Sequence, residues 1–94
     1  MLSQLPIDLT KVSKENLDRE ILRAGMLAEL DAINLYEQMA AMTDNADLKK
    51  ILLDVAKEEK THVGEFQHLL LKYDQEQVKE LEEGRKEVEK ELAE

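Results

Sequence analysis

The chain has 94 residues and a net charge of −9, from 13 basic and 22 acidic side chains. This length is enough for one small domain, and the scarcity of aromatic residues, glycine and proline is typical of long helices rather than of a sheet. The acidic balance argues against a nucleic-acid partner, because phosphate binding needs clustered lysine and arginine, and it favours the attraction of cations. The absence of cysteine excludes a disulfide, a zinc finger, a rubredoxin-type iron site and a thiol nucleophile.

The first segment, residues 1–12, is predicted to be an extended N-terminal arm. It holds the only proline, Pro6, and shows no sustained hydrophobic period. It also lacks the basic and apolar regions of a signal peptide, and no apolar run in the chain approaches the roughly 20 residues that cross a bilayer. We therefore expect a soluble, cytoplasmic protein without a membrane partner.

Residues 13–73 are predicted to form an antiparallel hairpin of two helices. Ser13 is a suitable N-cap, and apolar residues recur after it at steps of three and four as far as Met42. Turn-forming residues occupy positions 43–45, and a second helical pattern covers residues 46–73. A connection this short makes the two helices antiparallel neighbours.

Both helices have a wide apolar face, which we expect to form the core. On the first helix the apolar positions form two neighbouring stripes: Leu17, Ile21, Ala24, Ala28, Leu35, Met39 and Met42, and then Leu22, Met26, Ile33, Tyr36 and Ala40. On the second helix they are Leu48, Leu52, Val55, Phe66, Leu69 and Tyr73.

Residues 74–94 form the third segment, which is predicted to be an amphipathic helix or a linker. Asp74 together with Gln77 resembles a capping box at the start of a helix. Apolar positions are few, and Gly84 costs about 1 kcal/mol relative to alanine in a helix interior. The remaining residues are mainly Glu, Lys and Arg.

Three ionisable residues interrupt the apolar faces of the hairpin. Glu29 lies in line with Met26 and Ile33 on the first helix, and Glu59 and His62 lie in the apolar stripe of the second helix. A buried carboxylate without a partner costs on the order of several kcal/mol. Because the apolar faces of antiparallel helices meet, we expect these three groups to share a bound cation.

The spacing of these residues predicts half of a two-metal site. Residues 59–62 read Glu-x-x-His, which places a carboxylate and an imidazole one turn apart on one helix face. Ferritin-like di-iron bundles use a Glu from each of two helices and a Glu-x-x-His from each of the other two, and this chain carries one of each kind. Two-fold pairing of two chains would supply four carboxylates and two imidazoles, which suit iron or manganese.

We therefore predict an all-α fold in which the hairpin and the C-terminal helix complete a ferritin-like four-helix bundle by homodimerisation. The predicted ligands are Glu29, Glu59 and His62, which would hold two iron ions per dimer, or manganese. A residue near the two-fold axis meets its symmetry mate, so Glu59 is expected to bridge the two ions and Glu29 and His62 to be terminal ligands.

The stretches AELDAINLY (28–36) and ILLDVAKEEKTHVGEF (51–66) resemble the encapsulated ferritins. These are the short ferritin-like cargo of encapsulin nanocompartments, in the rubrerythrin-related branch of the ferritin superfamily. The resemblance extends over residues 20–71.

The resemblance also suggests roles for single residues. Glu29, Glu59 and His62 match the three metal ligands of that family. Tyr36 matches an aromatic that lies beside the site, where it could donate a hydrogen bond, be a redox bystander or pack in the core. Asp31 falls where the family carries a second acidic residue near the path by which metal enters, so it is a possible uptake site.

For function, the resemblance implies a ferroxidase that oxidises Fe(II) with oxygen at a di-iron site between two subunits, with dimers assembled into a decameric ring. The encapsulin shell would store the mineral, so the shell protein is an expected partner and the interior of the nanocompartment the expected location. Family members end in a targeting peptide or are fused to the shell. The charged end, residues 87–94, has no such tag, which suggests free cargo cut short or the front of a shell fusion.

Two other functions are compatible with the same residues. One is a di-iron or manganese peroxidase of the rubrerythrin type, although a full rubrerythrin would carry a cysteine-ligated iron site. The other is a non-enzymatic helical dimerisation module in which buried polar groups only fix the register. That module would stay folded and indifferent to metal after Glu59→Leu or His62→Leu.

Overall fold

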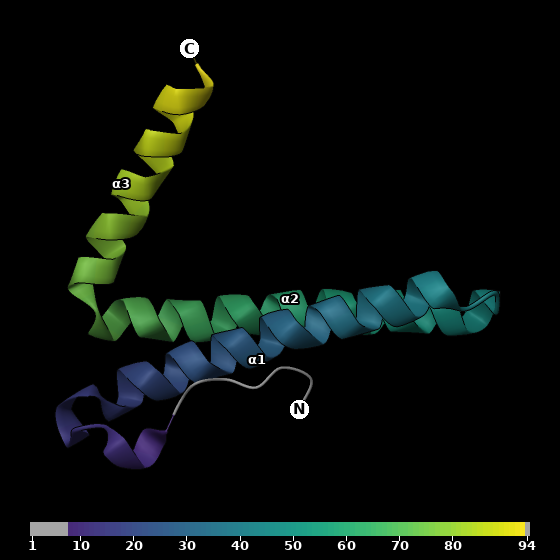
Figure 1. Cartoon of the computed structure of the whole chain (residues 1–94), viewed down its shortest axis with the longest axis horizontal. Helices are drawn as coiled ribbons and strands as arrows, with labels where there is room; N and C mark the ends of the chain where they lie inside the picture. Colours follow the sequence, from purple (N-terminus) through teal and green to yellow (C-terminus); the bar gives the residue numbers. More distant parts are fainter. Residues whose placement is uncertain (1–7, 94) are drawn as a thin grey trace.

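The computed structural model describes residues 8–93, which form an all-α chain with no strand among them (Figure 1). The elements are a short 3-10 helix η1 (Leu9–Lys11), α1 (Lys14–Met42), α2 (Ala46–Tyr73) and α3 (Gln75–Leu92). Helices α1 and α2 lie side by side and run antiparallel, and α3 leaves the end of α2 at a steep angle. The all-α class and the hairpin with a C-terminal helix are confirmed, while the bundle of two chains stays a prediction.

The segment before α1 differs from the predicted extended arm. Its described part contains the η1 turn, where the Asp8 carboxylate accepts a hydrogen bond from the backbone N–H of Thr10 at 3.0 Å. A short side chain that binds the local backbone in this way favours a turn over an extended chain. The rest of the arm, residues 1–7, lies outside the described residues. Helix α1 begins directly after Ser13, as predicted, although the Ser13 side chain makes no capping hydrogen bond.

The turn between the two long helices is held by its own polar side chains. Asn45 Oδ1 accepts the backbone N–H of Leu48 at 3.0 Å, which caps α2. Thr43 Oγ1 accepts the backbone N–H of Asn45 at 3.1 Å. These bonds satisfy donors that the helix start leaves free, so α2 begins at the predicted residue and returns along α1.

The contact between α1 and α2 buries only a narrow strip. Its buried apolar side chains are Leu22, Ile33, Ala40, Ala56 and Leu70. Two of these are alanines, which let the two backbones approach closely. A hairpin of two helices can bury only the sides that face each other, so the rest of each apolar face stays outside.

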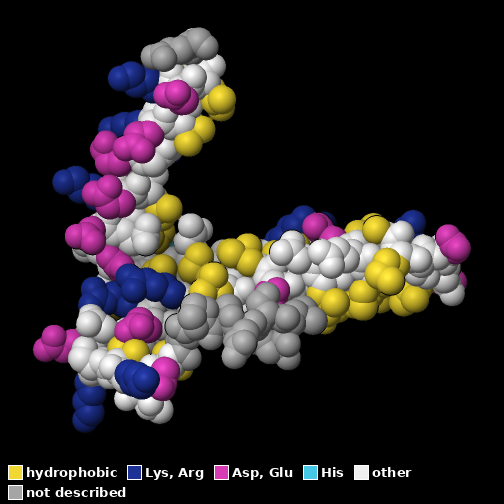
Figure 2. Space-filling view, in the orientation of Figure 1, with side chains coloured by type: hydrophobic (Ala, Val, Ile, Leu, Met, Phe, Trp, Pro, Cys, Tyr) yellow, Lys and Arg dark blue, Asp and Glu magenta, His cyan; other side chains and the backbone are white. Residues whose placement is uncertain are grey.

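Several residues of the predicted apolar faces are therefore exposed in a single chain, and their burial in a bundle of two chains stays a prediction. Met42 is 83% exposed, and the others are Ile21, Leu48, Leu69 and Tyr73. Hydrophobic side chains gather along the hairpin and on the side of α3 that faces it (Figure 2). Exposed apolar surface of this extent is typical of an interaction site.

The corner between α2 and α3 is fixed by Asp74. Its side chain accepts the backbone N–H of Gln77 at 3.0 Å, which caps α3 as the sequence predicted. It also accepts a hydrogen bond from Arg23 of α1 at 2.9 Å. Asp74 is only 7% exposed. This pair joins residues 51 positions apart, so it ties the start of α3 to the hairpin.

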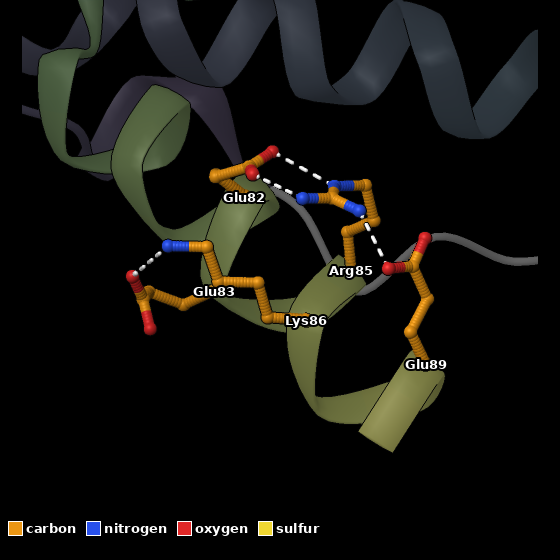
Figure 3. A network of polar contacts seen from close by, with 5 residues as sticks. All are labelled: Glu82, Glu83, Arg85, Lys86 and Glu89. Carbon is orange, nitrogen blue, oxygen red and sulfur yellow. Dashed lines mark hydrogen bonds and ion pairs between the residues drawn. The ribbon is translucent and has the colours of Figure 1, made fainter. Parts of the chain in front are cut away.

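Beyond this corner α3 is held by charges on its own surface (Figure 3). Arg85 binds Glu82 at 2.5 and 3.0 Å and Glu89 at 2.7 Å, and Lys86 lies 3.7 Å from Glu83. The hydrogen bonds with Glu82 and Glu89 raise the pKa of Arg85, and the bonds from Arg85 lower the pKa of Glu82. They span three or four positions, so they stabilise the helix even though it buries no residue. No helix in the described part of the chain is long and apolar enough to cross a membrane.

Candidate metal centre

The three predicted ligands meet between α1 and α2. Glu29 lies near the middle of α1, and Glu59 and His62 lie one turn apart on the facing side of α2. Nδ1 of His62 lies 3.4 Å from Oε2 of Glu29 and 3.3 Å from Oε2 of Glu59. One ligand atom from each residue falls within 4.8 Å of the other two. The structure thus brings together the set that the spacing singled out.

The position of this group in the hairpin follows from the helix period. Glu29 interrupts the stripe that packs Leu22 and Ile33 against α2, so its side chain also points at α2. Residues 59 and 62 are three positions apart and share one face of α2. Because the two helices are antiparallel and joined by a short turn, that face lies opposite Glu29. All three ligands therefore come from helices rather than from loops.

The carboxylates are mostly shielded from solvent, and one of their oxygens has no donor. The side chains of Glu29 and Glu59 are 21% and 19% exposed, while that of His62 is 43% exposed. Oε2 of Glu29 is buried and accepts no hydrogen bond. Its approach to His62 Nδ1 is close enough for an ion pair with a charged imidazole, but only Glu59 stands in hydrogen-bond geometry to that nitrogen.

This arrangement fits a cation. An anionic oxygen that is buried without a donor is costly, and a metal ion is the partner that would compensate it. Carboxylate oxygens and an imidazole nitrogen are ligands that suit iron and manganese rather than a soft metal. Glu29, Glu59 and His62 are the residues that would hold it.

Asp31 and Tyr36 do not join this group within one chain. Asp31 is two positions beyond Glu29, which is about 200° around the helix axis, and it lines a separate polar hollow with Asn34 and Gln38. Tyr36 lies on the same face as Glu29 but about 10 Å further along α1, where it is half-buried. Their roles in metal uptake and beside the ligands stay predictions.

Two contacts near the site had not been expected from the sequence. Lys60, inside the Glu-x-x-His stretch, pairs with Glu37 of α1 at 3.1 Å. Gly25, one turn before Glu29, lies against the ring of Phe66, one turn after His62. The available signal for the second contact was a glycine in the interior of a helix whose neighbouring residues are mostly good helix formers.

A helical hairpin with one Glu on its first helix and a Glu-x-x-His on its second defines half of a ferritin-like metal-binding bundle. The chain belongs to the EncFtn-like family, which matches residues 5–84.

Similar proteins agree with this assignment. The chain is 62% identical over 76 residues to a ferritin-like-encapsulin shell fusion protein of Pyrococcus furiosus, a match that covers 81% of this chain and 22% of that protein. It is 45% identical over 67 residues to the encapsulin nanocompartment cargo protein EncC of Myxococcus xanthus, covering 71% of this chain and 51% of that one. The chain thus spans about a fifth and about half of these two relatives.

A solved structure shows the same fold. The crystal structure of the encapsulated ferritin domain from Pyrococcus furiosus superposes with a TM-score of 0.82 at 53% identity. The match covers 96% of this chain and 94% of that one, so it includes all three helices. The resemblance read from the sequence is confirmed at the level of family and fold.

Proposed function

We propose that this chain is the subunit of a ferroxidase, which oxidises Fe(II) to Fe(III) with oxygen at a site shared by two copies. The observation that carries the proposal is the convergence of Glu29, Glu59 and His62 around a buried carboxylate oxygen that has no donor. The substrate Fe(II) would provide the missing positive charge.

One chain offers too few ligands for two ions, and a second copy would complete the set. Three side chains supply two carboxylates and one imidazole, whereas a two-fold pair supplies twice that number. The imidazole is 43% exposed, so the group is open on one side. Exposed apolar residues on both helices offer a surface for the second copy, including Leu53 of α2, at 47% exposed. In this pair Glu59 would be shared between the two ions, and Glu29 and His62 of each copy would be terminal ligands.

Glu29, Glu59 and His62 would act by binding the iron ions and by stabilising their positive charge. Two Fe(II) ions lose two electrons, and oxygen takes them up with two protons to give hydrogen peroxide; reduction of oxygen to water takes four Fe(II) ions. Each loss of an electron raises the charge held by the site, and the carboxylates stabilise that charge in a partly dry environment. The net charge of −9 attracts the cation from solution.

The names of the relatives support an association with an encapsulin shell. One similar protein is a fusion to an encapsulin shell, and the other is a nanocompartment cargo protein. We propose that this chain works inside such a shell in the cytoplasm, as a ring of dimers with ten subunits, and that the shell protein is its partner and stores the oxidised iron. Asp31, in its own hollow on α1, is the proposed point of metal uptake.

The decisive experiment is an aerobic Fe(II) titration of the metal-free protein, followed by ferric absorbance. A fast phase that ends at about one iron per chain is expected, because two chains share two ions. Glu59→Gln should abolish this phase, while Glu58→Gln, an equal change at the exposed neighbouring position, should preserve it. Absence of a breakpoint in the wild type would contradict the proposal.

The same preparation separates the alternatives. Peroxide consumption that outpaces oxygen-driven iron oxidation would identify a peroxidase, with iron or manganese. A protein that binds neither metal and keeps its stability in Glu59→Leu would be a structural module.

A further inference from the structure

The only phenylalanine of the chain, Phe66, lies flat against the only glycine of α1, next to the metal ligands. A Cβ atom added to Gly25 would lie 3.3 Å from three atoms of the Phe66 ring, Cδ2, Cε2 and Cζ. That is closer than ordinary van der Waals contact, which begins at about 3.5 Å between carbon atoms. A side chain at residue 25 would therefore require the ring, or the helix that carries it, to move by a few tenths of an ångström.

This contact occupies the layer directly next to the ligands. Gly25 is four positions before Glu29 on α1, and Phe66 is four positions after His62 on α2. Because the helices are antiparallel, the two steps lead in the same direction, and the Glu29–His62 contact of 3.4 Å is followed one turn on by the Gly25–Phe66 contact. A change in the spacing of α1 and α2 at the second contact would therefore act only one turn away from the first.

The other helical glycines show that this position is distinct. Gly64 and Gly84 would meet nothing within 4 Å if a Cβ were added. Glycine is the least favourable residue after proline for a helix interior, so alanine would suit all three positions better by propensity alone. Only at Gly25 does the neighbouring helix oppose that exchange.

We propose that Gly25 and Phe66 are positioning residues for the metal centre, which set the distance between Glu29 and the Glu59–His62 pair. This inference rests on the proposed function. In a Gly25→Ala variant the Phe66 ring must give way by a few tenths of an ångström, and on this proposal α2 moves with it. The metal–ligand distances of a well-formed site lie within about 0.2 Å of their standard values. A methyl group one turn from the ligands is therefore enough to change the site without touching a ligand.

The test is a double-mutant cycle on the full chain, with Co(II) as an oxygen-stable probe. Gly25→Ala is expected to weaken Co(II) binding about tenfold or more and to change the visible absorption band that reports the geometry of the bound ion. Phe66→Leu removes Cε2 and Cζ, two of the three atoms that the new methyl meets. The double variant should therefore bind Co(II) more tightly than Gly25→Ala alone. Gly84→Ala is the matched control and should bind like the wild type.

A purely structural role would give a different pattern. It would lower the melting temperature of Gly25→Ala but leave the absorption band of its folded fraction unchanged, and that result would overturn the inference. Wild-type affinity and spectrum in Gly25→Ala would overturn it too, with the proposed function intact. If Gly25→Ala does not fold, Phe66→Leu alone decides, and an unchanged Co(II) spectrum there overturns the inference. A wild type that binds no Co(II) or Fe(II) would overturn both.

Discussion

Replacing Glu29 with leucine should stabilise the metal-free protein and abolish its binding of metal ions. The wild type buries Oε2 of Glu29 without a hydrogen-bond donor, which costs about 1–3 kcal/mol. The change also removes a contact with His62, whose side chain is 43% exposed, and a pair this open contributes about 0–1 kcal/mol. Glutamate and leucine have similar helix propensities, so the backbone is little affected.

The net effect is an increase of about 1–2 kcal/mol in the free energy of unfolding, because the cost of burying the unpaired oxygen exceeds the contribution of the lost contact with His62. For a domain of this size that corresponds to a rise in melting temperature of roughly 5–15 °C. The assay is thermal unfolding followed by circular dichroism, with a chelator and then with excess Mn(II), at one chain concentration because the protein is expected to associate.

Mn(II) at 100 times its dissociation constant should stabilise the wild type by about 2.7 kcal/mol and Glu29→Leu not at all. Glu58→Leu is the control, because it removes the same charge at an exposed position on the neighbouring helix. It should stay close to the wild type with and without metal. A metal-free Glu29→Leu that melts below both other proteins would refute the reasoning, since the carboxylate would then be satisfied without an ion.

Three further changes test the fold. Asn45→Ala removes the cap that accepts the N–H of Leu48 and should cost about 1 kcal/mol, or roughly 4–8 °C in melting temperature; an unchanged melting curve would show that the cap is dispensable. The hydrogen bond from the Gln77 N–H, and then Arg23, lower the pKa of Asp74 from 3.8. The contribution of the Asp74 carboxylate to the free energy of unfolding is therefore complete above pH 3.8 and disappears as the pH falls through the lower pKa of the folded protein. Asp74→Asn keeps a capping oxygen but loses the charge, so its deficit in urea unfolding relative to the wild type should shrink below pH 3.8, and a constant deficit would contradict this. Arg85→Ala breaks the surface pairs of α3 and should cost below about 1 kcal/mol, with the difference from the wild type reduced in 1 M salt; a loss independent of salt would point to packing instead.

The local signals in the sequence were reliable for the helices. The turn residues at 43–45 gave the end of α1 and the start of α2, and Asp74 caps α3 as predicted. These features depend on backbone donors and on side chains within three or four positions, so a linear pattern contains them. The same holds for the ligand set, because a Glu-x-x-His shares one face of a helix wherever that helix lies.

Other features depend on contacts between segments and were missed. The sequence did not show that Met42 and Tyr73 are exposed in a single chain, because periodicity shows that a face is apolar but not which part of it one neighbouring helix can cover. The pairing of Arg23 with Asp74, 51 residues away, has no local signal.

By itself, then, the sequence determined the helices, their caps and which side chains are available as ligands, since each follows from the helix period and from neighbours along the chain. Tertiary structure alone decided how those ligands meet. The donorless oxygen of Glu29 and the contact of Gly25 with Phe66 arise from the register and spacing of α1 against α2, which are set by packing across the whole hairpin. A change of a few tenths of an ångström in that packing is invisible in a hydrophobic pattern, but at a metal centre it is large enough to matter.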